Sequence, residues 1–179
     1  LAGFENVASA TTAKKKRLDQ SAIAIVKITA NGWYVKDVEF GRWDIKDTAQ
    51  RIFNAVRDYE PVCVGVERGA LKNAVLPYLN DLMRKNNIYA HIQDLTHGNK
   101  KKTDRVVWSL QGRMEHGRIT FNDQEDWSEF RDQLIMFPTA GVHDDLVDAL
   151  SYIDQLAIAN YNADYEEDEY EVLDPISGY

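Results

Sequence analysis

The chain has 179 residues, of which 44% are hydrophobic, and its formal net charge is −8. This length suits one ordinary domain with a continuous core and argues against a second full domain. No apolar stretch approaches the roughly 20 residues that cross a bilayer, and the opening segment lacks the basic start of a signal peptide. Because the first residue is Leu1 and not Met, we expect an excised domain of a larger soluble protein, with no membrane partner.

The negative charge is concentrated at the end of the chain. Residues 160–179 contain seven acidic residues and no basic residue, which leaves about −1 for residues 1–159. These acidic residues are Asp164, Glu166, Glu167, Asp168, Glu169, Glu171 and Asp174. The pattern predicts a folded domain at 1–159 and an acidic tail at 160–179 that is flexible or bound by a partner.

The first part of the chain predicts an antiparallel meander of three strands. Residues 1–8 are short and apolar, and residues 21–29 and 33–40 are rich in residues that favour strands. The last two segments are joined through Asn31-Gly32, a strong hairpin signal. A helix at 44–59 follows, because apolar residues recur there at helical spacing.

The rest of the domain alternates between strands and helices. Val62–Val66 is a continuous apolar run, typical of a strand covered on both faces, and Cys63 within it is expected to be a buried thiol. Further strands are predicted at 88–94 and 118–121, and further helices at 70–86, 104–116, 127–136 and 142–159. The order indicates an α/β fold with a central mixed sheet, whose first three strands are antiparallel, flanked by helices.

Two acidic features are candidates for catalysis. Glu67 follows the buried run directly, at the strand end where open α/β sheets place their ligands, although an edge residue reaching solvent gives the same pattern. Asp145 and Asp148 are three residues apart, so a helix projects them from the same face. Asp144 is explained partly as a helix cap, and His143 either contacts a metal or water or caps the helix.

The chemistry of this acidic group favours hard divalent cations. Neighbouring carboxylates repel one another when they are desolvated, unless a cation binds between them. Oxygen ligands suit Mg²⁺ or Mn²⁺, whereas zinc requires more His or Cys. Two such cations bridged by a carboxylate activate water and stabilise the leaving oxygen of a phosphodiester. The residues therefore predict a two-metal nuclease site.

A basic segment supplies candidate DNA contacts. Lys100, Lys101, Lys102 and Arg105 form one of the two densest basic runs in a body of low net charge, and a nuclease of this kind concentrates positive charge beside its acids. The alternative interpretation is a solvated loop.

Six motifs in a fixed order carry a family resemblance. They are the opening strand with its Gly3-Phe4-Glu5 step, Leu18-Asp19-Gln20-Ser21-Ala22, Val64-Gly65-Val66-Glu67, Lys102-Thr103-Asp104-Arg105-Val106, Gly117-Arg118-Ile119-Thr120-Phe121, and Phe137-Pro138 before the run from His143 to Leu150. Together they resemble the nuclease domain of a tailed-bacteriophage terminase large subunit over about residues 1–159. The resemblance implies a ribonuclease H-like fold related to Holliday-junction resolvases, Mg²⁺ or Mn²⁺ as cofactor, and cutting of concatemeric viral double-stranded DNA during packaging.

The same resemblance implies partners and a location. They are an ATPase domain elsewhere in the full-length chain, a small terminase subunit, a portal, and the cytoplasm of the infected bacterial host. No Gly-x-x-x-x-Gly-Lys-[Ser/Thr] loop occurs in this sequence, in keeping with a separate ATPase domain.

One departure from the family pattern concerns the first strand. The family places an aspartate there, and this chain offers Glu5 by one spacing and Asn6 by another. Glu5 would bind metal with a longer arm, whereas Asn6 would be a weaker, neutral ligand. Asp19 is a further candidate for a nearby carboxylate, or a residue at the entry to the second strand.

Two other functions remain open at this stage. The same fold and metals would suit a nuclease of branched junctions or of RNA–DNA hybrids. A catalytically degenerate module that binds DNA or a protein partner is the non-enzyme alternative, because of Asn6 and the acidic tail.

Overall fold

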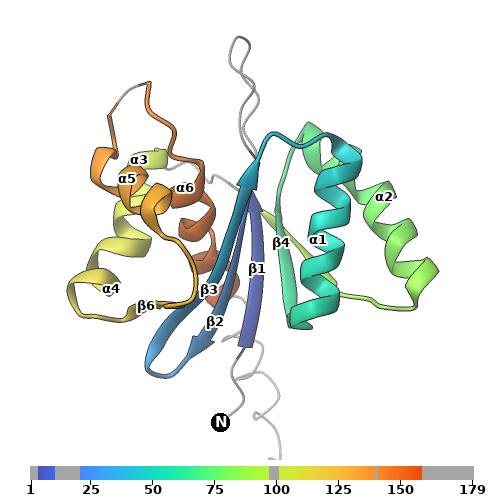
Figure 1. Ribbon diagram of the computed structural model, residues 1–179, viewed down its shortest axis with the longest axis horizontal. Helices are drawn as coiled ribbons and strands as arrows, with labels where there is room; N and C mark the ends of the chain where they lie inside the picture. Colours follow the sequence, from blue (N-terminus) through green and yellow to red (C-terminus); the bar gives the residue numbers. More distant parts are fainter. Residues whose placement is uncertain (1–3, 11–20, 97–100, 140, 159–179) are drawn as a thin grey trace, which may run out of the picture.

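The protein is described by a computed structural model that places residues 4–10, 21–96, 101–139 and 141–158, with the backbone alone for 4–10. A six-stranded sheet in the order β5-β4-β1-β2-β3-β6 lies at the centre (Figure 1). The strands are β1 (Phe4–Ala10), β2 (Ser21–Thr29), β3 (Gly32–Gly41), β4 (Cys63–Glu67), β5 (His91–Leu95) and β6 (Ile119–Phe121). The helices are α1 (Ile45–Tyr59), α2 (Ala70–Asn86), α3 (Lys102–Val106), the π-helix η1 (Val107–Gln111), α4 (Gly112–Glu115), α5 (Ser128–Met136) and α6 (Asp145–Ser151).

The sheet is mixed, as the sequence predicts. Strands β1, β2 and β3 pair in antiparallel fashion, whereas β4 pairs parallel with β1 and β5, and β6 pairs parallel with β3. Gly32 in the β2–β3 turn has a φ of 138°, and a Cβ there would collide with the carbonyl oxygen of Arg118. The backbone N–H of Trp33 donates to that same oxygen at 2.7 Å. The predicted Asn-Gly turn is therefore confirmed. The absence of a side chain at Gly32 also lets the backbone of Arg118, directly before β6, approach the turn closely.

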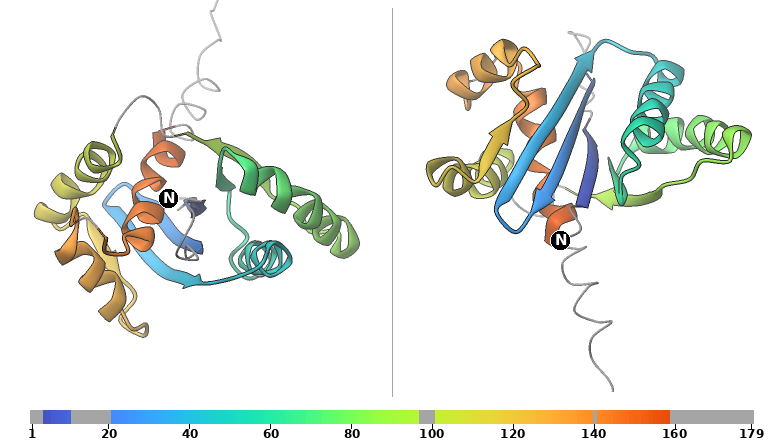
Figure 2. Two further views of the ribbon diagram at one scale, coloured as in Figure 1. Left: turned by 90° about the horizontal axis from the view of Figure 1, so that it is seen from above. Right: turned by 60° about the horizontal axis from the view of Figure 1, so that its bottom comes forward.

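Helices cover both faces of the sheet and divide the core into two halves. Helices α1 and α2 cover one face, and α6 lies on the other with α3, α4 and α5 outside it (Figures 1 and 2). Along the strands, successive residues face the two halves of the core in turn. Ile23 and Val64 belong to the half beneath α1 and α2, whereas Ala24 and Cys63 belong to the half beneath α6. Within the described residues, no helix combines the length and apolarity needed to cross a membrane.

Several predicted boundaries differ from the observed ones. Strand β1 covers Phe4–Ala10 instead of 1–8, and β5 begins at His91 because Asn87 ends α2 in a left-handed conformation. The helix predicted at 104–116 contains the π-helical turn η1, whose wider turns no 3.6-residue pattern anticipates. Helix α6 begins at Asp145, and helical backbone resumes at 153–158 after a turn at Tyr152.

Candidate active site

Strand β4 delivers Glu67 to one end of the sheet. All five residues of β4 are buried, and Glu67 is its last residue, only 8% exposed. The backbone N–H of Arg68 donates to the carbonyl of Leu95 at 2.8 Å, which holds the end of β4 beside the end of β5. A carboxylate at the end of this buried strand is therefore fixed in position by the sheet itself.

Helix α6 delivers the second group of carboxylates. It packs against β1 and β2 through Leu146 and Leu150, which are almost fully buried. Asp148 is 3% exposed, and Asp145, three residues earlier, is mostly buried. The start of the helix is held by Gln133 of α5, whose side-chain oxygen accepts a hydrogen bond from the Leu146 backbone N–H at 3.0 Å. Nothing in the sequence signals this anchor, because Gln133 lies in a different helix.

Tyr152 shows that Glu67 and Asp148 approach one region. Its phenol is fully buried. Burial raises the pKa of Tyr152 most, the negative charge of Glu67 raises it further, Arg105 opposes the shift, and Asp148 adds to it. The two acidic residues, predicted separately from a strand end and a helix turn, are therefore both close enough to act electrostatically on the same phenol.

Basic residues of α3 neutralise the acids of α6. Arg105 donates to the carboxylate of Asp148, and its guanidinium lies over the ring of Tyr152, 4.3 Å from the centroid. The ammonium of Lys102 lies 2.8 Å from Asp144 and 3.1 Å from Asp148. Burial lowers the pKa of Lys102, but Asp148 and Asp144 outweigh it, so the pKa stands above its usual value and the side chain is a cation.

Asp144 and His143 have partners that the sequence did not predict. Asp144 occupies the N-cap position of α6, yet its side chain makes no capping bond there and instead accepts from Lys102. The prediction that Asp144 caps the helix is therefore wrong for its side chain. His143 lies with its Nδ1 3.5 Å from the carboxylate of Asp145. Burial raises the pKa of Asp145 above its usual value, Lys102 and His143 oppose that shift, and Asp144 adds to it.

The first strand does not bring Glu5 or Asn6 to Glu67. In the parallel pairing of β1 with β4, Asn6 is level with Cys63, and Ala8 and Ser9 are level with Gly65 and Val66. Asn6 is thus four residues short of the Glu67 end, about 13 Å at the usual rise of a strand, and Glu5 is farther still. The expectation that either residue joins the acids finds no support in this register.

The remaining predicted residues fall into three groups. Asp19 and Lys100 lie outside the described residues. Lys101 is exposed, as a DNA contact requires, and Lys102 is partly exposed but paired with acids. Arg105 is buried and faces Asp148, so its predicted place on a DNA-contacting surface is corrected. Lys102 and Arg105 are three residues apart on α3, so both project from the same face of the helix toward Asp148.

The donor set matches a hard cation in chemistry. Its members are carboxylates, the oxygen ligands that Mg²⁺ and Mn²⁺ prefer. One cation, the Lys102 ammonium, already bridges Asp144 and Asp148. Among the side chains that the structure describes, however, no three His, Cys, Asp or Glu residues come together as a metal site.

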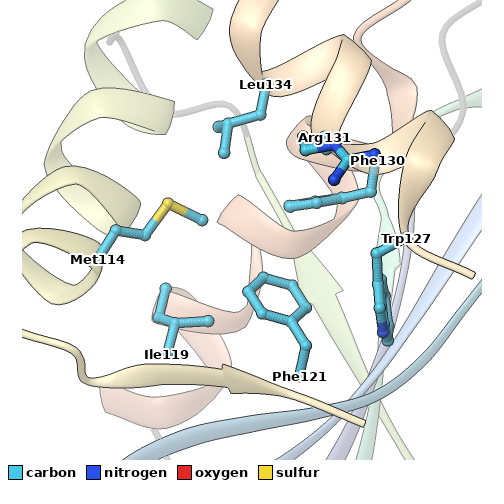
Figure 3. Close-up of a pocket in the computed structure, with 7 residues that line it drawn as sticks. All are labelled: Met114, Ile119, Phe121, Trp127, Phe130, Arg131 and Leu134. Carbon is cyan, nitrogen blue, oxygen red and sulfur yellow. The ribbon is translucent and has the colours of Figure 1, made fainter. Parts of the chain in front are cut away.

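A separate apolar pocket has no part in this chemistry. It has a volume of about 380 Å³ and lies between β6, α4 and α5 (Figure 3). Its lining is Met114, Ile119, Phe121, Trp127, Phe130, Arg131 and Leu134. Figure 3 shows the apolar side chains directed at one another across it. The lining includes no carboxylate, so the pocket offers no oxygen ligands for a cation.

Solved structures of low sequence identity share this fold. The human cytomegalovirus terminase nuclease domain, Mn soaked and inhibitor bound, aligns with a TM-score of 0.63 at 10% identity, over 87% of this chain and 84% of that one. The P22 large terminase nuclease domain aligns with a TM-score of 0.60 at 13% identity, over 87% and 82%. The large terminase of a thermophilic bacteriophage gives 0.60 at 11% identity over 87% of this chain, which spans 40% of that longer protein.

The family assignment comes from the sequence as a whole. No curated protein matches the chain. Residues 10–155 match the family described as "Terminase RNaseH-like domain", a span that includes Glu67, the basic turn of α3 and the acids of α6. The resemblance found in the motifs and the α/β fold with a mixed sheet are thereby confirmed. The chain belongs to the family of terminase RNaseH-like domains.

Proposed function

We propose that the chain is a divalent-metal-dependent endodeoxyribonuclease that cuts concatemeric viral DNA during genome packaging. The observation that carries the proposal is the burial of two carboxylates from different elements, Glu67 at the end of β4 and Asp148 in α6, whose charges both act on the buried Tyr152. Asp145, on the same side of α6 as Asp148, adds a further buried carboxylate. Desolvated acids from two elements, with cations held against them, form an electrostatic setting suited to phosphodiester hydrolysis.

Glu67, Asp145 and Asp148, with Asp144, would hold Mg²⁺ or Mn²⁺. The human cytomegalovirus relative was soaked with Mn, which supports the choice of cation for this chain. When bound, divalent cations would activate the attacking water and stabilise the leaving oxygen. We propose that the site holds two of them. The chain's own contribution is to fix the carboxylates and to present Lys101 to the DNA backbone.

We propose the partners of this chain from those of the large terminases that it resembles. The large terminase of the thermophilic bacteriophage has been solved in complex with ATP-gamma-S, and this chain spans 39% of it. We propose an ATPase domain outside the present sequence, together with a small terminase subunit and a portal. The location would be the cytoplasm of an infected bacterial host.

Plasmid cleavage tests the function. Supercoiled plasmid is incubated with the protein in Mg²⁺, Mn²⁺ or EDTA, and Glu67→Gln and Asp148→Asn are compared with wild type. Each variant should lose at least about a hundredfold in rate, as expected when a catalytic electrostatic contact is removed. Cutting in EDTA, or wild-type rates in both variants, would exclude the proposal.

Asp94→Asn is the matched control. Asp94 is level with Val66 at the same end of the sheet, but it pairs with Lys72 of α2 and with Arg68. Val66 belongs to the core half beneath α1 and α2, opposite the face that carries α6. The rate of Asp94→Asn should therefore stay within about threefold of wild type, as for a surface substitution away from the site.

A DNA-binding module without cleavage is the second candidate. The observation that favours it is the register of β1, in which Ala8 and Ser9, and no acidic residue, are level with Gly65 and Val66 just before Glu67. Tight DNA binding without cutting at millimolar Mn²⁺ would favour this candidate.

If the protein does cut, its cleavage rates on linear duplex, on a four-way junction and on an RNA–DNA hybrid separate packaging cleavage from a junction or hybrid nuclease.

A further inference from the structure

Lys102 binds two carboxylates of the site at once. Its ammonium lies 2.8 Å from Oδ1 of Asp144 and 3.1 Å from Oδ2 of Asp148. The lysine begins α3, whereas Asp144 is the N-cap residue of α6 and Asp148 lies in its first turn, more than forty positions later in the sequence. A single positive group between two carboxylates takes the position that a metal cation would also favour.

Lys102 differs from the other cation of the site in how firmly it is held. The Arg105 side chain is 8% exposed and lies over the Tyr152 ring, whereas the Lys102 side chain is 33% exposed. Arginine presents a rigid planar fork, and lysine carries a compact charge on a flexible four-carbon stem. Arg105 is therefore fixed against Asp148, while Lys102 has a path to solvent.

We infer that Lys102 is a displaceable counter-cation, which competes with the divalent metal for Asp144 and Asp148 and so sets the metal concentration at which the site fills. The inference rests on the proposed function, since it assumes that these carboxylates hold a metal. Lys102 is then a positioning residue, which keeps the acids together and leaves them when the metal arrives. A purely structural ion pair would instead support metal binding by holding α3 against α6.

Metal affinity separates these two roles without any measurement of cleavage. Mn²⁺ is titrated into the full chain without DNA, and free Mn²⁺ is followed by electron paramagnetic resonance. Lys102→Met and Lys102→Gln remove the charge but keep much of the side chain, and each should bind Mn²⁺ about tenfold more tightly than wild type. Lys102→Arg, which retains a cation, should show no such gain.

Lys101→Met is the matched control for net charge. Lys101 is the exposed neighbour, so its removal changes the overall field by the same amount without freeing a carboxylate. Its affinity for Mn²⁺ should stay within about twofold of wild type, since exposed charges interact weakly. Wild-type or weaker affinity in both Lys102→Met and Lys102→Gln, beside measurable binding by wild type, would overturn the inference and leave the proposed function standing. No Mn²⁺ binding by any form would overturn both.

Discussion

Arg105 of α3 donates a hydrogen bond to Asp148 of α6 inside the protein, and both side chains are less than a tenth exposed. The guanidinium also lies over the ring of Tyr152. A carboxylate removed from water is costly unless it is paired, and Arg105 supplies that pairing to Asp148. Stability and the proposed catalysis therefore depend on the same ion pair.

Arg105→Met should destabilise the fold strongly. The substitution keeps an apolar stem over Tyr152 but removes a charge that Asp148 needs, and breaking a buried pair by losing one partner costs about 3–5 kcal/mol. Urea unfolding followed by circular dichroism measures the loss. Converting both members, as Arg105→Met with Asp148→Leu, should recover most of it, because no uncompensated charge remains.

An exposed pair provides the comparison for that loss. Arg84 and Asp81 form an ion pair on the surface of α2, with both side chains more than half exposed. Arg84→Met should cost less than about 1 kcal/mol, because water and salt screen such pairs. Equal losses for Arg84→Met and Arg105→Met would show that burial does not govern the Arg105 pair.

The sequence is informative where one local pattern determines the structure. The Asn31-Gly32 turn, the amphipathic helix α1 and the buried run that ends at Glu67 each contain their own signal, and the structure confirms them. Partners from distant segments leave no such signal. Gln133 binds the start of α6 from another helix. Arg105, which binds Asp148, lies in a basic run whose sequence predicts DNA contact or a solvated loop and gives no sign of this buried partner.

Strand register is the other feature that the sequence does not reveal. The sequence predicts the first strand two to three residues too early, and a shift of this size changes which residue lies beside Glu67. The register follows from how β1 pairs with β2 and β4, so it depends on the patterns of all three strands and not on β1 alone. Glu5 and Asn6 are therefore candidates by sequence, although the pairing brings Ala8 closer to the end of β4.

Ala8→Asp should strengthen metal binding. Ala8 is level with Gly65, two residues before Glu67, so a carboxylate introduced there adds an oxygen donor near the existing acids. We expect at least about tenfold tighter Mn²⁺ binding and faster plasmid cutting, in line with one added charged ligand. Calorimetric titration with Mn²⁺ measures the first effect.

Asn6→Asp is the control for that substitution. It places the same carboxylate on the same strand, but level with Cys63 and two residues farther from Glu67. Its Mn²⁺ affinity should match that of wild type. A larger gain from Asn6→Asp than from Ala8→Asp would contradict the register argument.

Asp145→Asn should stabilise the protein in EDTA at neutral pH. Burial raises the pKa of Asp145 above the usual 3.8, so the folded state favours the neutral carboxyl more than the unfolded state does. The resulting stability is present below the unfolded pKa and is lost as pH rises through the folded pKa. Thermal melts should give the variant a higher Tm at pH 7 and no advantage at pH 3.

Asp126 should show the opposite sign. Hydrogen bonding from the Ser128 backbone N–H lowers the pKa of Asp126, so its contribution is present above the usual pKa and is lost as pH falls through the lowered one. Asp126→Ala should therefore reduce Tm at pH 7, with the difference shrinking in acid. A lower Tm for Asp145→Asn than for wild type at pH 7 would contradict the assignment for Asp145, and a higher Tm for Asp126→Ala would contradict that for Asp126.

Gly65→Ala tests how tightly the strand that carries Glu67 is packed. A Cβ at Gly65 would lie 2.8 to 2.9 Å from three side-chain atoms of Leu95, which is fully buried, so Leu95 would have to shift within the core. Overpacking of this kind costs about 1–3 kcal/mol, and it should also reduce cutting because Glu67 is two residues away.

Gly112→Ala is the control: its Cβ would meet nothing within 4 Å and its backbone is helical, so stability should rise by about 0.4–1 kcal/mol. Urea unfolding of both variants decides the matter, and a neutral Gly65→Ala would mean that Leu95 yields and that β4 tolerates a larger residue near Glu67.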